Sequence, residues 1–217
     1  SLPAIPPTEA PAFDEPVTSW ADFWKDDFKN RLAMPAITTT TGPMTVYIAG
    51  QVAGVDVKEE TDKAFDKLKE LNPNVVKYYS KSSEMVNMFS QGEIEASAIM
   101  DFAYGSIKES VPTAELIEPE EGFYAVVNTM NITKNSDKKD LAHKFINWVL
   151  SKKVQKRNAL DKIDSPVNKT VNLTKEQAKG VTYGRELVEN LNMVDWKYLN
   201  EVKKDWIRKW NREIIAQ

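Results

Sequence analysis

The chain has 217 residues, of which 41% are hydrophobic, and this is enough apolar surface for one domain of ordinary size or two smaller lobes. Its 29 basic and 32 acidic residues leave a net charge of -3, so charge gives no reason to expect a nucleic-acid partner. Cysteine is absent and His143 is the single histidine, which excludes disulfides, thiolate ligands, a cysteine nucleophile and a multi-histidine metal site; we therefore expect no metal and no cofactor.

The chain begins with a proline-rich stretch, residues 1–17, which favours extended chain over a folded element, and we expect a linker or a truncated end there. Beyond it, short apolar runs alternate with segments of helical period. Strands are expected at 31–37, 75–79, 94–100, 114–118 and 123–130, with helices between them at 42–53, 59–71, 83–91 and 104–109. After residue 137 the pattern is almost entirely helical, with helices expected at 138–150, 151–160, 175–190 and 195–215.

This order of elements predicts the fold class. Strands that alternate with helices of 10 to 15 residues are typical of α/β structure with a parallel, two-sided sheet. We therefore expect residues 18–122 to form an α/β lobe with a parallel-dominated five-stranded sheet. The helical portion that follows needs another surface on which to pack.

Five sequence segments carry a family resemblance. They are TSWADFWKDDFKNRLAMP at 18–35, DKAFDKLKELNPN at 62–74, MVNMFSQGEIEASAIM at 85–100, EGFYAVVNTMNITKNS at 121–136 and SPVN at 165–168. In this order they resemble the polyamine-type and iron-type extracellular solute-binding proteins of ABC transporters. The resemblance covers nearly the whole chain, and it implies the type II periplasmic-binding-protein fold, in which two lobes joined by crossover strands hold a ligand between them.

The resemblance also implies a domain plan. Residues 1–17 are the linker or truncated end, 18–122 the second α/β lobe, and 123–217 a crossover strand and a helical portion that returns to the first lobe. On this plan the chain lacks the N-terminal part of lobe one. Apolar side chains such as Phe145 and Trp148 would then lack the sheet that they cover, so we expect repacking, self-association of the fragment or poor order after residue 136.

The function that the resemblance implies is that of the substrate-binding component of an ABC importer. Such a protein closes two lobes around a small polar solute and delivers it to the membrane subunits of the permease. We expect a periplasmic or extracellular location, with membrane anchoring through a missing N-terminal segment. The alternative is an enzyme on the same scaffold, but no catalytic constellation is found, so we expect no catalytic residues.

The first candidate ligand site is the threonine run that follows the strand at 31–37. Thr39, Thr40 and Thr41 lie between this strand and a helix, at the carboxyl end of a parallel strand, where open α/β sheets bind ligands. Their hydroxyls and the free N–H groups of a helix N-terminus suit an anion or a polar oxygen. The alternative is that one threonine caps the helix and the others are solvated.

The second candidate follows the strand at 94–100. Asp101 could pair with a cationic group of a ligand, and Phe102 or Tyr104 could stack on it, because aromatic faces attract cations. The alternative is that Asp101 caps a short helix and the aromatic rings fill the core. Since both candidates follow strands of one parallel sheet, we expect them to converge on one edge.

The third candidate rests on the resemblance alone. Asn128 lies where polyamine binders carry an aspartate that grips an ammonium group, and an amide compensates such a charge poorly. Of the paired tyrosines of the iron binders, only Tyr104 is matched. Tyr78 and Tyr79 are explained by alternating exposure along a strand. The chemical class of the ligand therefore stays open.

Overall fold

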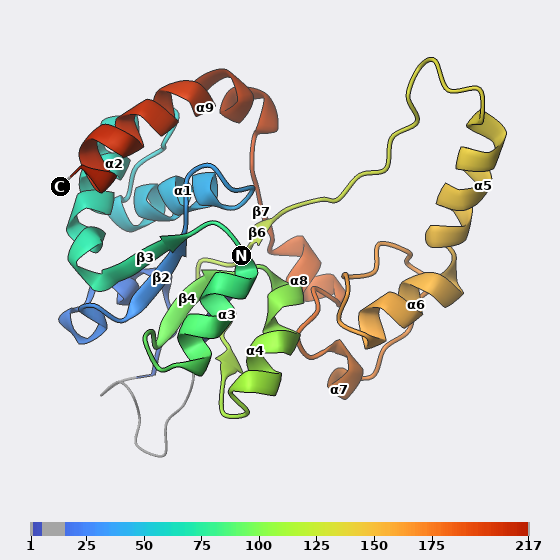
Figure 1. Ribbon diagram of the computed structural model, residues 1–217, viewed down its shortest axis with the longest axis horizontal. Coiled ribbons are helices and arrows are strands. Elements are labelled where there is room, and N and C mark those ends of the chain that lie inside the picture. Colours follow the sequence, from blue (N-terminus) through green and yellow to red (C-terminus); the bar gives the residue numbers. More distant parts are fainter. Residues whose placement is uncertain (1, 6–15, 217) are drawn as a thin grey trace. The chain divides into compact units, whose positions relative to one another are not determined.

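The computed structural model describes residues 2–5 and 16–216 (Figure 1). The chain forms two compact units. Unit 1 comprises residues 1–125 and 191–217, and unit 2 comprises residues 126–190. These units reflect contacts within this chain, whereas the lobe boundaries expected from the sequence concern an intact two-lobe protein, so those boundaries stay a prediction.

Unit 1 contains a five-stranded sheet with the strand order β3, β2, β4, β1, β5. The strands are β1 Leu2–Ile5, β2 Leu32–Pro35, β3 Val75–Tyr79, β4 Ala96–Ile99 and β5 Glu115–Leu116. β2 pairs in parallel with β3 and β4, and β1 pairs antiparallel with β4 and β5. Because β1 is antiparallel to both neighbours, the other four strands share one direction. The prediction of an α/β lobe with a parallel-dominated five-stranded sheet is confirmed.

Two strands differ from the expectation. β1 lies in the segment that we interpreted as a linker, and its pairing covers an edge of β4 that would otherwise expose backbone donors and acceptors; residues 6–15 of that segment lie outside the described residues. The strand expected at 123–130 is reduced to β6, Tyr124–Ala125, which pairs in parallel with β7, Asn192–Met193, in a separate two-stranded sheet. The chain leaves unit 1 after β6 and re-enters it before β7.

The helices of unit 1 follow its strands in alternation. They are α1 Gly42–Ala53, α2 Thr61–Leu71, α3 Ser82–Ser90 and α4 Tyr104–Ser110, and α9 Trp196–Trp210 continues into a π-helical turn at Asn211–Ile215. Short 3-10 turns lie at Trp20–Trp24, Asp26–Phe28, Asn72–Asn74 and Asp101–Ala103.

Local sequence accounts for where α1 begins and ends. Pro43 lies in the first turn, where a missing N–H costs nothing, and Gly54 ends the helix with a φ of 69°. Gly42 approaches the preceding strand so closely that a Cβ on it would lie 1.9 Å from the carbonyl oxygen of Ala36. No other residue fits at position 42 without moving the backbone.

The last helix packs on unit 1 through an apolar stripe that contains two tryptophans. Trp206, Trp210 and Ile214 are buried. The ring of Trp206 lies 5.7 Å from that of Tyr47 on α1, and the ring of Trp210 lies 4.8 Å from that of Tyr78 on β3. Figure 1 shows α9 running beside α1 and α2. Helix α9 is therefore part of the core of unit 1.

An ionic cluster holds the end of the chain to α2. The carboxylate of Glu213 accepts contacts from Lys69 at 3.1 Å, Lys209 at 3.1 Å and Arg212 at 2.6 Å. Burial alone would raise the pKa of Glu213, but the hydrogen bonds from Arg212, Lys209 and Lys69 outweigh it and lower the pKa to about 2. The amide of Asn72 also donates to the carbonyl oxygen of Ile214 at 3.1 Å.

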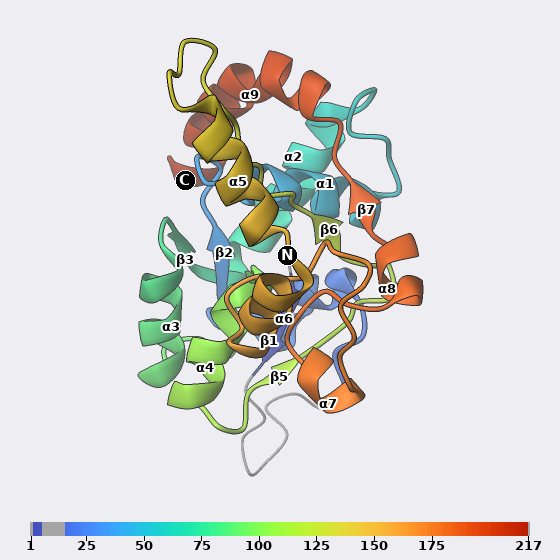
Figure 2. The same ribbon diagram turned by 90° about the vertical axis from the view of Figure 1, so that its right-hand side faces the viewer.

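Unit 2 is a set of helices and loops (Figure 2). Its helices are α5 Lys139–Val149, α6 Lys152–Leu160, α7 Lys175–Ala178 and α8 Arg185–Glu189. The single helix expected at 175–190 is broken into α7 and α8, because Gly180 and Gly184 between them have φ values of 75° and 106°. Among the described residues, no helix is long and apolar enough to cross a membrane.

Helix α5 keeps its apolar face uncovered. It contains no buried residue, and Leu141, Phe145 and Trp148 are 65%, 55% and 59% exposed. The rings of Phe145 and Trp148 lie 5.8 Å apart on this face. Within the described part of the chain, nothing covers this apolar face.

Candidate functional site

The carboxyl ends of three parallel strands lie at one edge of the sheet in unit 1. β2 lies between β3 and β4, and its residues Leu32 and Ala33 pair with Ala96 and Ser97 of β4. Since paired parallel strands run side by side, the segments that follow β2 and β4 both start from this edge. These segments carry the threonine run and Asp101, the two candidates expected to meet there.

The hydroxyl of Thr39 forms hydrogen bonds within its own loop. Its hydroxyl donates to the carbonyl oxygen of Ala36 at 2.8 Å and accepts the N–H of Gly42 at 2.9 Å. The backbone N–H of Thr39 donates to the same carbonyl oxygen at 2.9 Å. Thr39 therefore closes the loop between β2 and α1, and the capping interpretation holds for this residue.

The neighbouring threonines differ in accessibility. Thr40 is exposed, whereas Thr41, the residue before α1, is 5% exposed and its side chain makes no capping hydrogen bond. One turn further, the hydroxyl of Thr45 is buried and has no hydrogen-bond partner in the described part of the chain. Of the run, Thr40 presents the hydroxyl best placed to reach a ligand from outside.

The backbone amides at the start of α1 are less available than we expected. The N–H of Gly42 is taken by Thr39, Pro43 has none, and the N–H of Met44 donates to the carbonyl oxygen of Thr41 at 2.9 Å. The expectation of free N–H groups is therefore wrong for these positions. A polar ligand at this loop would be met by hydroxyl groups.

Asp101 starts the 3-10 turn that leads into α4. Its Oδ1 accepts the N–H of Phe102 at 2.9 Å, so the carboxylate also organises its own turn. The ring of Phe102 is 44% exposed, and the hydroxyl of Tyr104 donates to the carbonyl oxygen of Ala114 at 3.2 Å. Phe102 is thus the more accessible of the two aromatic candidates.

Asn128 belongs to unit 2, not to this edge of the sheet. It is exposed, and its Nδ2 donates to Oδ2 of Asp164 at 3.3 Å. Its assignment as a ligand residue stays a prediction from the family resemblance.

Tyr79, the last residue of β3, was explained from the sequence by alternating exposure along the strand, but burial along β3 does not alternate and Tyr79 is buried. Its hydroxyl donates to the carbonyl oxygen of Ala98 on β4 at 2.6 Å, and its own carbonyl oxygen accepts the N–H of Ala36 at 2.9 Å. The side chain is buried, and burial raises the pKa of Tyr79, so the phenol stays a donor. The usable signal in the sequence was a polar aromatic residue at the carboxyl end of a predicted strand.

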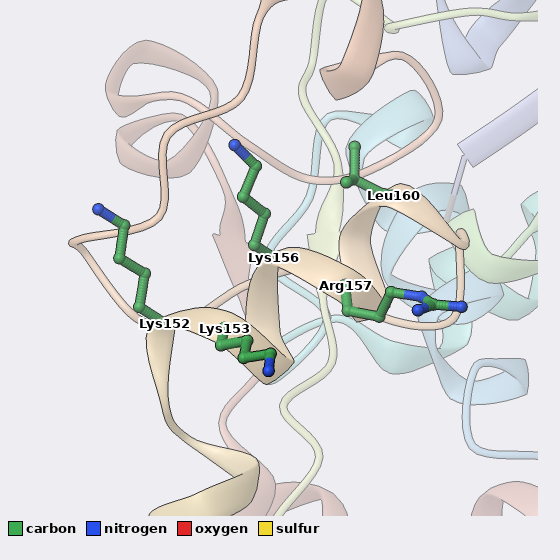
Figure 3. A pocket seen from close by; sticks show the side chains of 5 residues that line it. All are labelled: Lys152, Lys153, Lys156, Arg157 and Leu160. Carbon is green, nitrogen blue, oxygen red and sulfur yellow. The ribbon is translucent and has the colours of Figure 1, made fainter.

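A second feature lies in unit 2, where α6 carries a basic cluster. Lys152, Lys153, Lys156 and Arg157, with Leu160, line a hollow of about 490 Å³. Figure 3 shows that their charged ends point apart and do not meet at one point. Arg157 is paired with Asp161 at 2.6 Å. This cluster is a solvated helix face, on which Lys152, Lys153 and Arg157 are exposed. In the described residues, no group of three or more His, Cys, Asp or Glu side chains could hold a metal ion.

Comparison with known proteins gives a family. The family model for bacterial extracellular solute-binding proteins matches residues 7–183. A solved structure of an ABC transporter from Clostridium perfringens is 46% identical, with a TM-score of 0.84, and the match covers 98% of this chain and 66% of that one. Spermidine/putrescine-binding periplasmic protein 1 of Haemophilus influenzae is 27% identical over 146 residues, 67% of this chain and 40% of the relative.

A third comparison concerns the fold alone. The spermidine/putrescine ABC transporter substrate-binding protein of Streptococcus pneumoniae is 18% identical, with a TM-score of 0.72, over 95% of this chain and 65% of that one. The chain thus matches about 40% of the length of its curated relative and about two thirds of each of these solved chains.

Proposed function

The chain belongs to the bacterial extracellular solute-binding protein family. From this we propose that it acts as the substrate-binding component of an ABC importer. In this role the intact protein holds a small polar solute between two lobes and delivers it to the membrane subunits of a permease. Family membership favours this function over the alternative of an enzyme on the same scaffold, and the relatives named above are binding or transport proteins.

One observation supports the place of the solute on this chain. The segments after β2 and β4 start from the same edge of a parallel sheet, and they present the exposed hydroxyl of Thr40 and the exposed ring of Phe102 beside Asp101. Hydroxyl, carboxylate and aromatic groups suit a polar solute that carries donor groups. Thr39, Thr41 and Tyr104 remain proposed ligand contacts of these two segments, and Asn128 is a separate proposal that rests on the family resemblance alone.

The relatives provide a first set of ligands to test. Two of the proteins named above carry spermidine/putrescine in their names, so spermidine and putrescine come first, followed by neutral and anionic solutes. The experiment is to denature the purified full-length protein and to identify released small molecules by mass spectrometry. Each candidate is then added back, with thermal unfolding and recovery of the molecule as readouts.

We expect one molecule to raise the melting temperature and to be recovered unchanged. Chemical conversion of that molecule would favour the enzyme alternative. No retained molecule, together with no shift for any member of the panel, would contradict the proposal. Thr40→Val should reduce the shift, whereas Thr38→Val, the same change at an exposed neighbour, is the matched comparison.

Two further parts of the proposal concern location and association. We propose that the intact protein works in the periplasm or outside the cell, anchored to the membrane by a segment outside the described residues; fractionation of cells that make the full-length protein tests this. We also propose that the chain self-associates through the uncovered face of α5, where Leu141, Phe145 and Trp148 are exposed. A sedimentation coefficient that does not change with concentration would exclude the association.

A further inference from the structure

The central strand β2 ends on a residue that cannot complete its ladder. The N–H of Ala36 donates toward β3, to the carbonyl oxygen of Tyr79. Because successive residues of a strand direct their backbone groups to opposite sides, the backbone of Pro35 faces β4. The register that pairs Ala33 with Ser97 continues to place Pro35 opposite Ile99.

This register identifies the carbonyl group that lacks a donor. In a parallel ladder the hydrogen bonds are slanted, and the N–H opposite Ile99 would donate to the carbonyl oxygen of Ala98. Proline has no N–H, so β2 leaves this acceptor without its ladder partner. Ala98 is buried, and a buried carbonyl without a donor destabilises the fold.

The hydroxyl of Tyr79 supplies the missing donor to the carbonyl oxygen of Ala98. It lies 2.6 Å from the carbonyl oxygen of Ala98, closer than the hydroxyl of Ser97, which lies 3.3 Å from the same atom. Tyr79 is on β3, the strand on the other side of β2. Its side chain therefore spans the end of β2 and joins the two strands that flank it.

Both candidate segments are tied to this one residue. The carbonyl oxygen of Tyr79 accepts the N–H of Ala36, and the carbonyl oxygen of Ala36 in turn accepts the hydroxyl and the N–H of Thr39. The hydroxyl of Tyr79 holds Ala98, three residues before Asp101. One residue thus holds both starting points, because its backbone carbonyl holds the start of the threonine loop and its hydroxyl holds β4 ahead of the Asp101 turn.

We propose that Tyr79 is a positioning residue for the solute site, where its hydroxyl replaces the donor missing at Pro35 and ties the end of β3 to that of β4 across β2. The proposal rests on the proposed function, because a positioning role requires that a solute binds at this edge of the sheet. Tyr79 itself is buried and does not contact the solute.

The test removes one hydroxyl and then restores the donor elsewhere. Tyr79→Phe keeps the ring and deletes the hydrogen bond to Ala98. The matched control is Tyr78→Phe, which deletes a hydrogen bond of 3.0 Å to Asn72, away from the candidate segments. The double variant Tyr79→Phe with Pro35→Ala gives residue 35 an N–H that can donate to Ala98, and Pro35→Ala alone is its reference.

Hydrogen–deuterium exchange over residues 98–104 is the first readout, since it needs no ligand. The net effect of one hydrogen bond predicts exchange about threefold to tenfold faster in Tyr79→Phe, no change there in Tyr78→Phe, and return toward the wild-type rate in the double variant. Equal rates in Tyr79→Phe and wild type, or no rescue by Pro35→Ala, would overturn the proposal.

Spermidine affinity, measured by calorimetry on the full-length protein, is the second readout. Where the wild type binds spermidine, we expect Tyr79→Phe to weaken binding by about threefold or more and Tyr78→Phe to leave it unchanged. Equal weakening by both variants would reduce Tyr79 to a structural residue. If the wild type does not bind spermidine but the exchange rates of the variants change as expected, the result would count against a polyamine ligand. It would not count against the role of Tyr79 in holding this edge of the sheet.

Discussion

Neutralising Glu213 should loosen the end of the chain by an amount that depends on pH. Glu213→Gln keeps the size of the side chain but removes the charge that Lys69, Lys209 and Arg212 contact. Lowering the pKa from 4.5 to about 2 corresponds to roughly 3 kcal/mol at 1.36 kcal/mol for each pKa unit. Arg212 is largely exposed and water screens its charge, so we expect a loss of about 1–2 kcal/mol at pH 7.

The sign of the pH dependence follows from the direction of the shift. A carboxyl group whose pKa is lower in the folded state stabilises the fold fully above its unfolded pKa, here 4.5. The stabilisation is lost as the pH falls from 4.5 through about 2. Glutamine does not titrate, so the difference between wild type and Glu213→Gln should shrink over this range.

Urea unfolding followed by tryptophan fluorescence measures the effect. With a slope of about 2 kcal/mol per molar urea, the midpoint should fall by about 0.5–1 M at pH 7. Glu70→Gln is the matched control, because Glu70 pairs with Lys67 on the exposed side of α2 and should cost at most about 0.5 kcal/mol. The reasoning fails if Glu213→Gln and Glu70→Gln are equally stable at pH 7, or if the difference between wild type and Glu213→Gln is independent of pH.

Three more perturbations test other contacts by the same unfolding assay or by sedimentation. Gly42→Ala should destabilise the fold by about 2 kcal/mol or more, because its Cβ would lie 1.9 Å from the carbonyl oxygen of Ala36. Gly54→Ala should cost about 1 kcal/mol, for its left-handed φ alone, and a larger loss of stability in Gly54→Ala than in Gly42→Ala would contradict the packing at α1. Asn74→Ala should cost about 2 kcal/mol, because Nδ2 bridges the carbonyls of Phe23 and Lys25 at 2.8 and 3.0 Å, and an unchanged urea midpoint would refute this. Phe145→Ser with Trp148→Ser should reduce concentration-dependent sedimentation without lowering the urea midpoint, and unaltered association would exclude the α5 face.

Local sequence patterns were enough to place most elements of unit 1. The alternation from residue 31 to residue 110 predicted three strands and four helices close to their observed bounds, because the hydrophobic period of a helix or a strand depends only on residues close together in sequence. β1 was missed because its place between β4 and β5 depends on partners about 95 to 115 residues away, and proline-rich sequence alone favours a linker. The break between α7 and α8 was readable, since Gly180 and Gly184 stood in the expected helix.

In the candidate site, too, sequence patterns predicted the placement of segments but not the contacts of individual side chains. That the threonine run and Asp101 begin at one edge follows from parallel pairing, which sequence could predict. That Thr39 is used in the loop and Thr40 is accessible depends on individual hydrogen bonds and on exposure, which no pattern specifies. The sequence shows Tyr79 as a polar aromatic residue at a strand end, but its role was not predicted, because that role arises from the register of Pro35 against β4 and not from its own neighbours.

The split of unit 1 into two stretches of sequence makes unit 2 an insertion between strands that are hydrogen-bonded neighbours. Tyr124 is opposite Asn192 in the β6–β7 pair, and the N–H of Asn192 donates to the carbonyl oxygen of Phe123 at 2.7 Å. The end that leaves and the end that returns are thus only a few residues' length apart. Replacing Val126–Asn190 with a linker about eightfold shorter would lower the entropy cost of bringing these ends together by roughly 2 kcal/mol. We therefore expect the α/β lobe to fold as a minimal protein that keeps the edge with Thr40, Phe102 and Tyr79.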